Sequence, residues 1–165
     1  MATQTLADWS VNLNFSSLPP EVVRAAVRSF YNWAGCVVGG SAHPATTIAR
    51  NALARFSGLP TSRLLGSQGS VDVDAMHAAL FNGIASHVHD YDDTHLETII
   101  HPTGPVASAL LAIVESLDRP VSGEEFITAL VAGIEAECKV GLAVWPSHYD
   151  VGWYVAIRFV KSSSD

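Results

Sequence analysis

Apolar side chains recur at intervals of three and four residues along almost the whole of this chain. That spacing follows one face of an α-helix, whereas a β-strand would alternate every second residue. No two strand-like segments joined by a tight turn occur in the sequence. We therefore expect an all-α fold, a helical bundle with mostly antiparallel neighbours. After Pro20, for example, the apolar positions are Val22, Val23, Ala26, Val27, Phe30 and Trp33.

Proline, glycine and capping residues mark where the helices are expected to begin and end. Ser122 and Glu125 have the spacing of a capping box, which places the start of the last helix. An aspartate, Asp72 or Asp74, is well suited to precede the fourth helix. The expected helices cover approximately residues 6–13, 20–40, 45–56, 72–89, 102–117 and 126–144, with a glycine-broken loop or short strand over 63–71.

The composition indicates one folded domain with more apolar surface than it buries by itself. Of 165 residues, 48% are apolar and only 15% are charged, whereas an average domain has about 25% charged residues. This excludes disorder and predicts that a partner or a further stretch of chain covers the surplus. Two cysteines, Cys36 and Cys138, cannot form a disulfide framework, and we expect them to be buried thiols. Packing roles are expected for Trp9, Trp33 and Trp145 and a hydrogen-bonded helical position for His77.

Charge and hydropathy exclude two kinds of partner. The formal net charge is −7, and the nine Lys and Arg are scattered, so no nucleic acid is expected to bind. Residues 29–49 carry no charged side chain, but Gly39, Gly40 and Pro44 interrupt them, so no membrane span is expected. The first ten residues have the features of neither a signal peptide nor a transit peptide. We therefore expect a cytoplasmic protein.

The segment from His87 to His101 holds the one dense group of titratable side chains. Its fifteen residues, HVHDYDDTHLETIIH, include four histidines, three aspartates and one glutamate. The segment connects two expected helices, a common position for functional groups. No Lys or Arg occurs from Leu64 to Asp118, so the carboxylates lack cationic partners nearby in the sequence. Crowded carboxylates and imidazoles of this kind bring acid and base forms within reach of neutral pH.

Three interpretations of this segment stay open from the residues alone. In the first, Asp90 and Asp92 accept hydrogen bonds from turn N–H groups, while His95 and Glu97 are solvated and His101 only holds the chain. In the second, zinc or iron is bound by imidazoles and carboxylates, although their spacing matches no established ligand pattern. The candidate ligands of that string are His87, His89, Asp90, Asp92, Asp93 and His95. In the third, a carboxylate orients an imidazole that moves a proton on a bound acid, without a metal.

The same segment carries the motif of a known family. With it, the sequence resembles the MmgE/PrpD family, whose members include 2-methylcitrate dehydratase, cis-aconitate decarboxylase and iminodisuccinate epimerase. The motif consists of Asn82-Gly83, His87, the run Asp90-Tyr91-Asp92-Asp93-Thr94-His95, and His101-Pro102-Thr103-Gly104. The resemblance covers residues 5 to about 153 and includes Leu6-Ala7-Asp8-Trp9, Leu18-Pro19-Pro20-Glu21-Val22-Val23, Ser122-Gly123 and Gly133-Ile134-Glu135.

The resemblance implies an architecture and an assembly. Residues 1–153 would be an incomplete helical domain of this family, whose smaller α/β lid domain is absent, and residues 154–165 would be a divergent tail. Family enzymes act on small di- and tricarboxylates without a cofactor, usually as homodimers. We accordingly expect a small carboxylate substrate, a homodimer, and no metal or other cofactor.

The resemblance also implies roles for individual residues. The catalytic residues carried over by motif are Asp90, Thr94 and His101. Asp90 and Thr94 would position the substrate or the imidazole, and His101 would transfer a proton or bind a carboxylate. Asp93 and His95 would contact substrate, and Asp93 would also support the turn.

Two departures from the family pattern bear on what the chain is expected to do. Gly152-Trp153 is followed by Tyr154, where family members usually have a pocket histidine. Roughly two thirds of a family-sized chain would also be missing, including the lid and a later lysine and tyrosine that contact substrate. A frameshift or premature stop would explain the unusual final residues. Since a tricarboxylate needs positive partners, this piece alone is expected to bind one poorly.

The expected function is that of a cofactor-independent lyase. Dehydration of 2-methylcitrate is the leading expectation, and decarboxylation of cis-aconitate is the next. In dehydration, a base removes a proton from a carbon beside a carboxylate while an acid protonates the leaving hydroxyl. A non-catalytic helical oligomerisation module, derived from the enzyme, is the alternative from another functional class.

Overall fold

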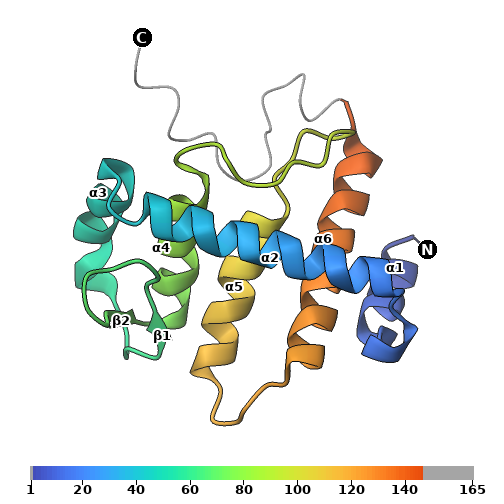
Figure 1. Ribbon diagram of the computed structural model, residues 1–165, viewed down its shortest axis with the longest axis horizontal. Coiled ribbons are helices and arrows are strands. Elements are labelled where there is room, and N and C mark those ends of the chain that lie inside the picture. Colours follow the sequence, from blue (N-terminus) through green and yellow to red (C-terminus); the bar gives the residue numbers. More distant parts are fainter. Residues whose placement is uncertain (1, 147–165) are drawn as a thin grey trace.

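The computed structural model describes residues 2–146 and confirms the all-α fold (Figure 1). Its one small sheet within that range pairs two-residue strands in antiparallel register, Ser62 with Val73. The helices are α1 (Ala2–Asn12), α2 (Pro20–Gly40), α3 (Pro44–Leu53), α4 (Ala75–His87), α5 (Thr103–Ser116) and α6 (Gly123–Val144), and the strands are β1 (Ser62–Arg63) and β2 (Asp72–Val73). Short 3-10 helices cover Phe15–Ser17 and Ala54–Phe56. The expected boundary at residue 153 and Tyr154 lie outside the described residues.

Three helices run side by side in alternating directions, and a fourth crosses them. Figure 1 shows α4, α5 and α6 antiparallel to their neighbours, with α2 lying across all three. The most extensive packing joins α4 to α5 and α4 to α2. The connection between α4 and α5 therefore lies at one end of the bundle, beside the C-terminal end of α6.

The core forms where α2 crosses the other helices. Trp33 is fully buried there, and its indole Nε1 donates a hydrogen bond to Ser108 Oγ at 3.0 Å. Its ring stacks on Phe30 with a centroid distance of 5.2 Å. This confirms the packing role expected of Trp33. Trp9 and Trp145 are half-buried, as are the free thiols Cys36 and Cys138, which were expected to be fully buried.

Side-chain caps explain two helix starts. Both halves of the predicted capping box are present: Glu125 N donates to Ser122 Oγ, and Ser122 N donates to Glu125 Oε2. Asp74, not Asp72, caps α4 by accepting hydrogen bonds from the backbone N–H and the Nδ1 of His77. Burial opposes ionisation of Asp74, but these bonds and one from Gly58 N lower its pKa to about 2. His77 is thus hydrogen-bonded on the helix, as expected.

The buried face of α4 differs from the one its sequence pattern suggests. Apolar residues spaced by four begin with Met76 and Leu80, yet Met76 is 83% exposed and Leu80 is 45% exposed. Small and polar side chains, together with the ring of Phe81, are buried instead, because α4 packs closely against both α2 and α5. The buried residues are Ala78, Phe81, Asn82, Ala85 and Ser86.

Buried Asn82 ties α4 to the segment around β1. Its Oδ1 accepts a hydrogen bond from Leu65 N at 3.1 Å, and its Nδ2 donates to Arg63 O at 3.0 Å. A buried amide is tolerated because both of its polar ends are bonded. This gives Asn82, part of the family motif, a structural role.

Large apolar side chains remain exposed in the part of the chain that the structure describes. Tyr31 is 81% exposed, Tyr91 is 79% exposed and Leu96 is 85% exposed. This agrees with the surplus apolar surface predicted from composition. None of the helices within residues 2–146 combines the length and the apolar character needed to cross a bilayer.

Candidate functional site

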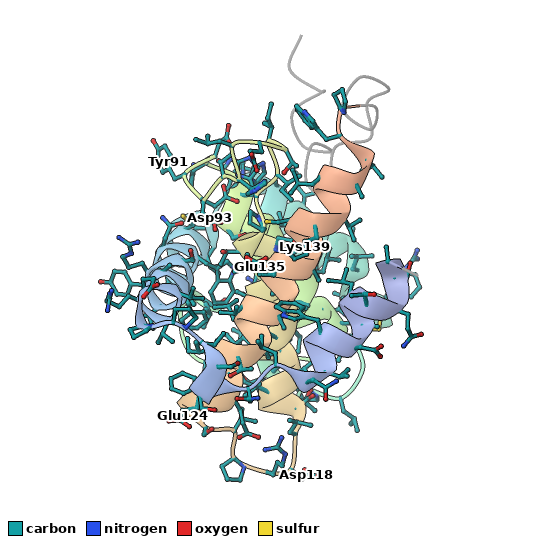
Figure 2. The ribbon with its side chains drawn as sticks, turned by 90° about the vertical axis from the view of Figure 1, so that its right-hand side faces the viewer. Tyr91, Asp93, Asp118, Glu124, Glu135 and Lys139 are labelled. Carbon is teal, nitrogen blue, oxygen red and sulfur yellow. The ribbon has the colours of Figure 1, made fainter. Side chains whose placement is uncertain are left out.

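The dense group of titratable residues lies on the connection between α4 and α5. The last residue of α4 is His87, and α5 begins at Thr103, so residues 88–102 form a loop held by a helix at each end. Figure 2 shows Tyr91 and Asp93 on this loop and Glu135 and Lys139 on the neighbouring helix α6. The loop is therefore fixed on three sides by regular structure.

Asp92 is the centre of the site. Its side chain is 1% exposed, and its Oδ1 lies 2.9 Å from His87 Nδ1 and 3.6 Å from His101 Nδ1. The two imidazole rings lie edge to face, with centroids 4.6 Å apart. A buried carboxylate placed beside two imidazoles holds both rings in position.

Asp90 approaches the same group from the loop. Its Oδ1 lies 3.8 Å from His101 Nε2, and its side chain is 55% exposed. Asp90 has a φ of +57°, the left-handed conformation that aspartate tolerates better than most residues. The turn also lets Asp90 N donate a hydrogen bond to His87 O at 2.8 Å. The carboxylate is thus brought to the solvent side of His101.

Thr94, expected with Asp90 and His101 in the site, lies beside His101. Its Oγ1 is 3.5 Å from His101 Nδ1, at the limit of a hydrogen bond. The structure therefore brings together the three residues expected to be catalytic, Asp90, Thr94 and His101. Their catalytic role stays a prediction.

Asp93 and His95, expected to contact substrate, have partners within the loop and at α5. Asp93 accepts hydrogen bonds from Thr103 Oγ1 at 2.6 Å and from Thr103 N at 3.3 Å, where α5 begins. His95 Nδ1 lies 2.7 Å from Thr98 Oγ1, in a turn closed by backbone pairing with Ile100. These bonds tie Asp93 to the first residue of α5, and its expected support of the turn stays a prediction. A substrate contact for either residue remains a prediction.

A hollow of about 300 Å³ separates this part of the loop from α6. Lys139 on its wall is paired with Glu135, with Nζ and Oε2 3.2 Å apart. Thr94 therefore faces both the imidazole of His101 and a space large enough for a small ligand group. The loop contributes Asp93, Thr94, His95 and Pro102 to the lining, and α6 contributes Ile134, Glu135, Cys138, Lys139 and Leu142.

The observed contacts decide against the first interpretation of the segment. Asp92 is hydrogen-bonded to the imidazole of His87 and lies 3.6 Å from that of His101, where that interpretation expected backbone N–H groups. The carboxylate that bonds the backbone across the loop is Asp93. Glu97 is largely exposed, as that interpretation expected, but His95 is half-buried and bonded.

His87 and Asp92 were not among the residues expected to act. Both residues appeared in the family motif, but no catalytic or substrate-binding role was expected of either. No local signal in the sequence singles out Asp92. Only the path of the loop places its carboxylate beside His87 and His101.

Glu137 is a half-buried acid on α6 near the site. Its Oε1 is inaccessible and has no hydrogen-bond partner within the described residues. Burial, reinforced by the negative charge of Asp93, raises the pKa of Glu137 to about 7. Burial likewise raises the pKa of the Cys138 thiol to about 11, with Glu137, Glu135 and Asp93 adding to the effect. Cys138 is therefore a protonated, weakly nucleophilic thiol at neutral pH.

The raised pKa of Glu137 predicts a loss of stability as the pH increases. In the unfolded chain Glu137 ionises near its ordinary pKa of 4.5, whereas in the folded protein it keeps its proton until about pH 7. The stabilisation is thus fully present below pH 4.5 and is lost as the pH rises through 7. Glu137→Gln should remove this loss and, after discounting for partial solvent screening, be about 1–2 kcal/mol more stable than wild type at pH 8.

Urea unfolding of both proteins at pH 4, 6 and 8 measures this effect. Glu124→Gln, an exposed substitution in the first turn of the same helix, is the control and should follow the wild-type pH profile. A constant difference between wild type and Glu137→Gln across the three pH values would contradict the prediction.

The chain is similar to one protein family and to several curated proteins. The model of the MmgE/PrpD N-terminal domain matches residues 4–164. The cis-aconitate decarboxylase-like protein oryM of Aspergillus oryzae is 27% identical over 158 residues, 92% of this chain and 32% of that protein. Human cis-aconitate decarboxylase is 30% identical over 141 residues, 84% of this chain and 29% of that protein. The Aspergillus terreus enzyme of that name is 25% identical over 156 residues, 92% of this chain and 31% of that protein.

These matches agree with the motif and with the helical architecture. The chain spans about a third of the length of the curated relatives it matches. The matched region contains the loop that carries Asp90, Thr94 and His101. This chain belongs to the MmgE/PrpD family and corresponds to its N-terminal domain.

Proposed function

We propose that this chain supplies the proton-transfer site of a lyase that acts on a small unsaturated tricarboxylate such as cis-aconitate. The observation that supports the proposal most strongly is the position of His101. Its imidazole lies between buried Asp92 and solvent-facing Asp90, with Thr94 at its edge. An imidazole held in this way has a fixed orientation and retains access to a ligand.

In this proposal His101 moves the proton and its neighbours position it. Asp92 accepts a hydrogen bond from the imidazole of His87 and lies 3.6 Å from His101 Nδ1, and it thereby limits rotation of both rings. Because Asp92 is 1% exposed, water competes little for these contacts. Asp90 and Thr94 lie closer to the open side, where they would contact substrate.

Decarboxylation requires little more than an acid at the correct position. The bond between the substrate carbon and one carboxyl group breaks and releases CO2. The electron pair stays on the remaining carbon framework, which then takes up one proton. Protonated His101 would donate that proton and regain one from solvent, so that the enzyme is unchanged after each turnover.

The names of the relatives support cis-aconitate over 2-methylcitrate as substrate. Matched proteins from three species are called cis-aconitate decarboxylase or cis-aconitate decarboxylase-like. Dehydration of 2-methylcitrate, the leading expectation from sequence, uses the same proton-transfer groups and has no such support. It serves below as the comparison substrate.

The charges around the described part of the site indicate that substrate carboxylates need additional positive charge. The loop and the facing part of α6 carry several carboxylates, and Lys139 is already paired with Glu135. A tricarboxylate therefore needs positive charge from elsewhere or from protonated His87 and His101. We propose that residues outside the described range, in this protein or a partner copy, supply it.

Product analysis tests the proposal. Purified chain would be incubated with cis-aconitate or 2-methylcitrate, and the products would be followed by proton NMR. We expect CO2 and a five-carbon unsaturated dicarboxylate from cis-aconitate, and at least tenfold slower loss of water from 2-methylcitrate. The opposite substrate preference would favour a dehydratase. No turnover of either substrate, with the chain folded, would favour the non-catalytic module.

A further inference from the structure

We propose that His87, Asp90, Asp92 and His101 together bind one Zn²⁺ or similar transition-metal ion, and that the bound ion inhibits proton transfer at His101. The metal would be an inhibitor and not a cofactor. The binding follows from the geometry alone. Only the inhibition rests on the proposed function.

The four side chains converge on one point. Each offers one ligand atom, and the four atoms lie within 4.8 Å of one another. In tetrahedral Zn²⁺ coordination, with metal–ligand bonds near 2.0–2.1 Å, neighbouring ligand atoms are about 3.4 Å apart. Contacts of 2.9 Å between His87 and Asp92 and 3.6 Å between His101 and Asp92 already bracket that spacing. Small side-chain rotations would therefore complete the site.

The donor set suits zinc better than calcium or magnesium. Two imidazole nitrogens and two carboxylate oxygens are borderline ligands of the kind that zinc binds, whereas the alkaline-earth ions prefer oxygen ligands alone. Sequence spacing did not suggest this set. The ligand string considered from sequence included His89, whose ring instead packs edge-on against His43 at 5.4 Å.

Charge around the cluster favours a dication. Asp90 and Asp92 together neutralise two positive charges, and the imidazoles bind a metal in their neutral form. No Lys or Arg occurs between Leu64 and Asp118, so none adjacent in sequence opposes the ion. Lys139, on α6, is paired with Glu135.

Burial would further strengthen the site. The exposed fractions are 15% for the His87 side chain, 1% for Asp92 and 22% for His101. Asp90, 55% exposed, would close the site from the solvent side and leave an entry path for the ion. Ligands already held in place lose little entropy on binding. With one ring nitrogen bound to metal, His101 cannot take up the second proton and so cannot act as the imidazolium donor of the proposed mechanism.

Zinc titration of tag-free apo chain against a competing chromophoric chelator tests the binding. We expect one ion per chain and at least 100-fold weaker binding in His101→Ala and His87→Ala. His77→Ala is the matched control, since His77 also pairs with an aspartate on α4 but at its other end. Its affinity should equal that of wild type. Circular dichroism would establish that each variant is folded. Asp90→Asn is a fourth variant, and because Asp90 is an exposed ligand this substitution carries little risk to folding.

Cobalt substitution and turnover assays complete the test. Co²⁺ in the site should give the intense visible absorption of a tetrahedral complex, and this signal should be absent in His101→Ala. Equal zinc affinity of His101→Ala and His77→Ala, or no stoichiometric binding by wild type, would overturn the site. Stoichiometric binding without any turnover would leave the metal site intact and count against the proposed lyase. Turnover that is insensitive to saturating zinc would overturn the inhibition and support the lyase.

Discussion

Replacing His101 with alanine is expected to lower turnover of cis-aconitate about a thousandfold. The imidazole is the proposed proton donor, and general acid catalysis by a positioned side chain contributes roughly 10²–10⁴-fold to a rate. A thousandfold loss corresponds to about 4 kcal/mol of transition-state stabilisation. In the proposed mechanism His101 acts on the reacting carbon and Asp90 and Thr94 position the substrate, so most of the loss should appear in kcat and little in KM.

Steady-state kinetics by NMR on wild type, His101→Ala and His77→Ala would measure the effect. His77 is the suitable control because its Nδ1 lies 2.6 Å from Asp74, in a histidine–aspartate pair at the start of α4. His77→Ala should keep wild-type kcat even if it unfolds more easily. A His101→Ala variant within threefold of wild type would remove His101 from the mechanism.

Replacing Gly40 with alanine is expected to destabilise the fold by about 3 kcal/mol, the upper end of the usual cost of overpacking. A Cβ at Gly40 would overlap the backbone carbonyl oxygen of Ala85 and would lie 2.7 Å from Val88 Cγ2. The obstacle is backbone on α4, so no rotamer change relieves it. The helices α2 and α4 would have to separate where they pack most closely.

Gly35 provides a control in the same helix. A Cβ at Gly35 meets nothing within 4 Å, so Gly35→Ala should stabilise the protein by about 0.5–1 kcal/mol through helix propensity. Urea unfolding gives both values. The prediction for Gly40 is wrong if the two variants have equal midpoints. Because Val88 leads directly into the loop, Gly40→Ala should also disturb the site.

Helix identity and several helix starts were predictable because they depend on neighbours in the sequence. The capping box at Ser122 and Glu125 needs only residues three apart, and the structure contains both of its hydrogen bonds. Asp74 and Asp72 were both candidates for one cap. The local sequence pattern does not distinguish them. In the structure Asp72 lies in β2, where it pairs with Arg63 of β1, and Asp74 caps α4.

The buried face of α4 was less predictable. Leu80 and Met76 are apolar, yet they are exposed because the helix is pressed between α2 and α5 on its small residues. Periodicity identifies an apolar stripe, but it does not say which side has a neighbour close enough to require alanine and glycine. The side with the close neighbour becomes known only from the structure, in which α2 crosses α4 at Gly40 and Ala85.

By itself, the sequence determined the all-α class, the family, and the segment that holds the candidate site, because periodicity, motif and composition are local properties. It also placed Asp90, Thr94 and His101 in one group. Only the tertiary structure identified Asp92 as the buried partner of His87 and His101. It also showed that Asp93 instead accepts a hydrogen bond from the first residue of α5. The loop has no periodic pattern to predict its path, which depends on where α4 and α5 end and on a left-handed turn at Asp90. Contacts between residues fourteen apart, as in the pair of histidines, arise only once those helices are packed.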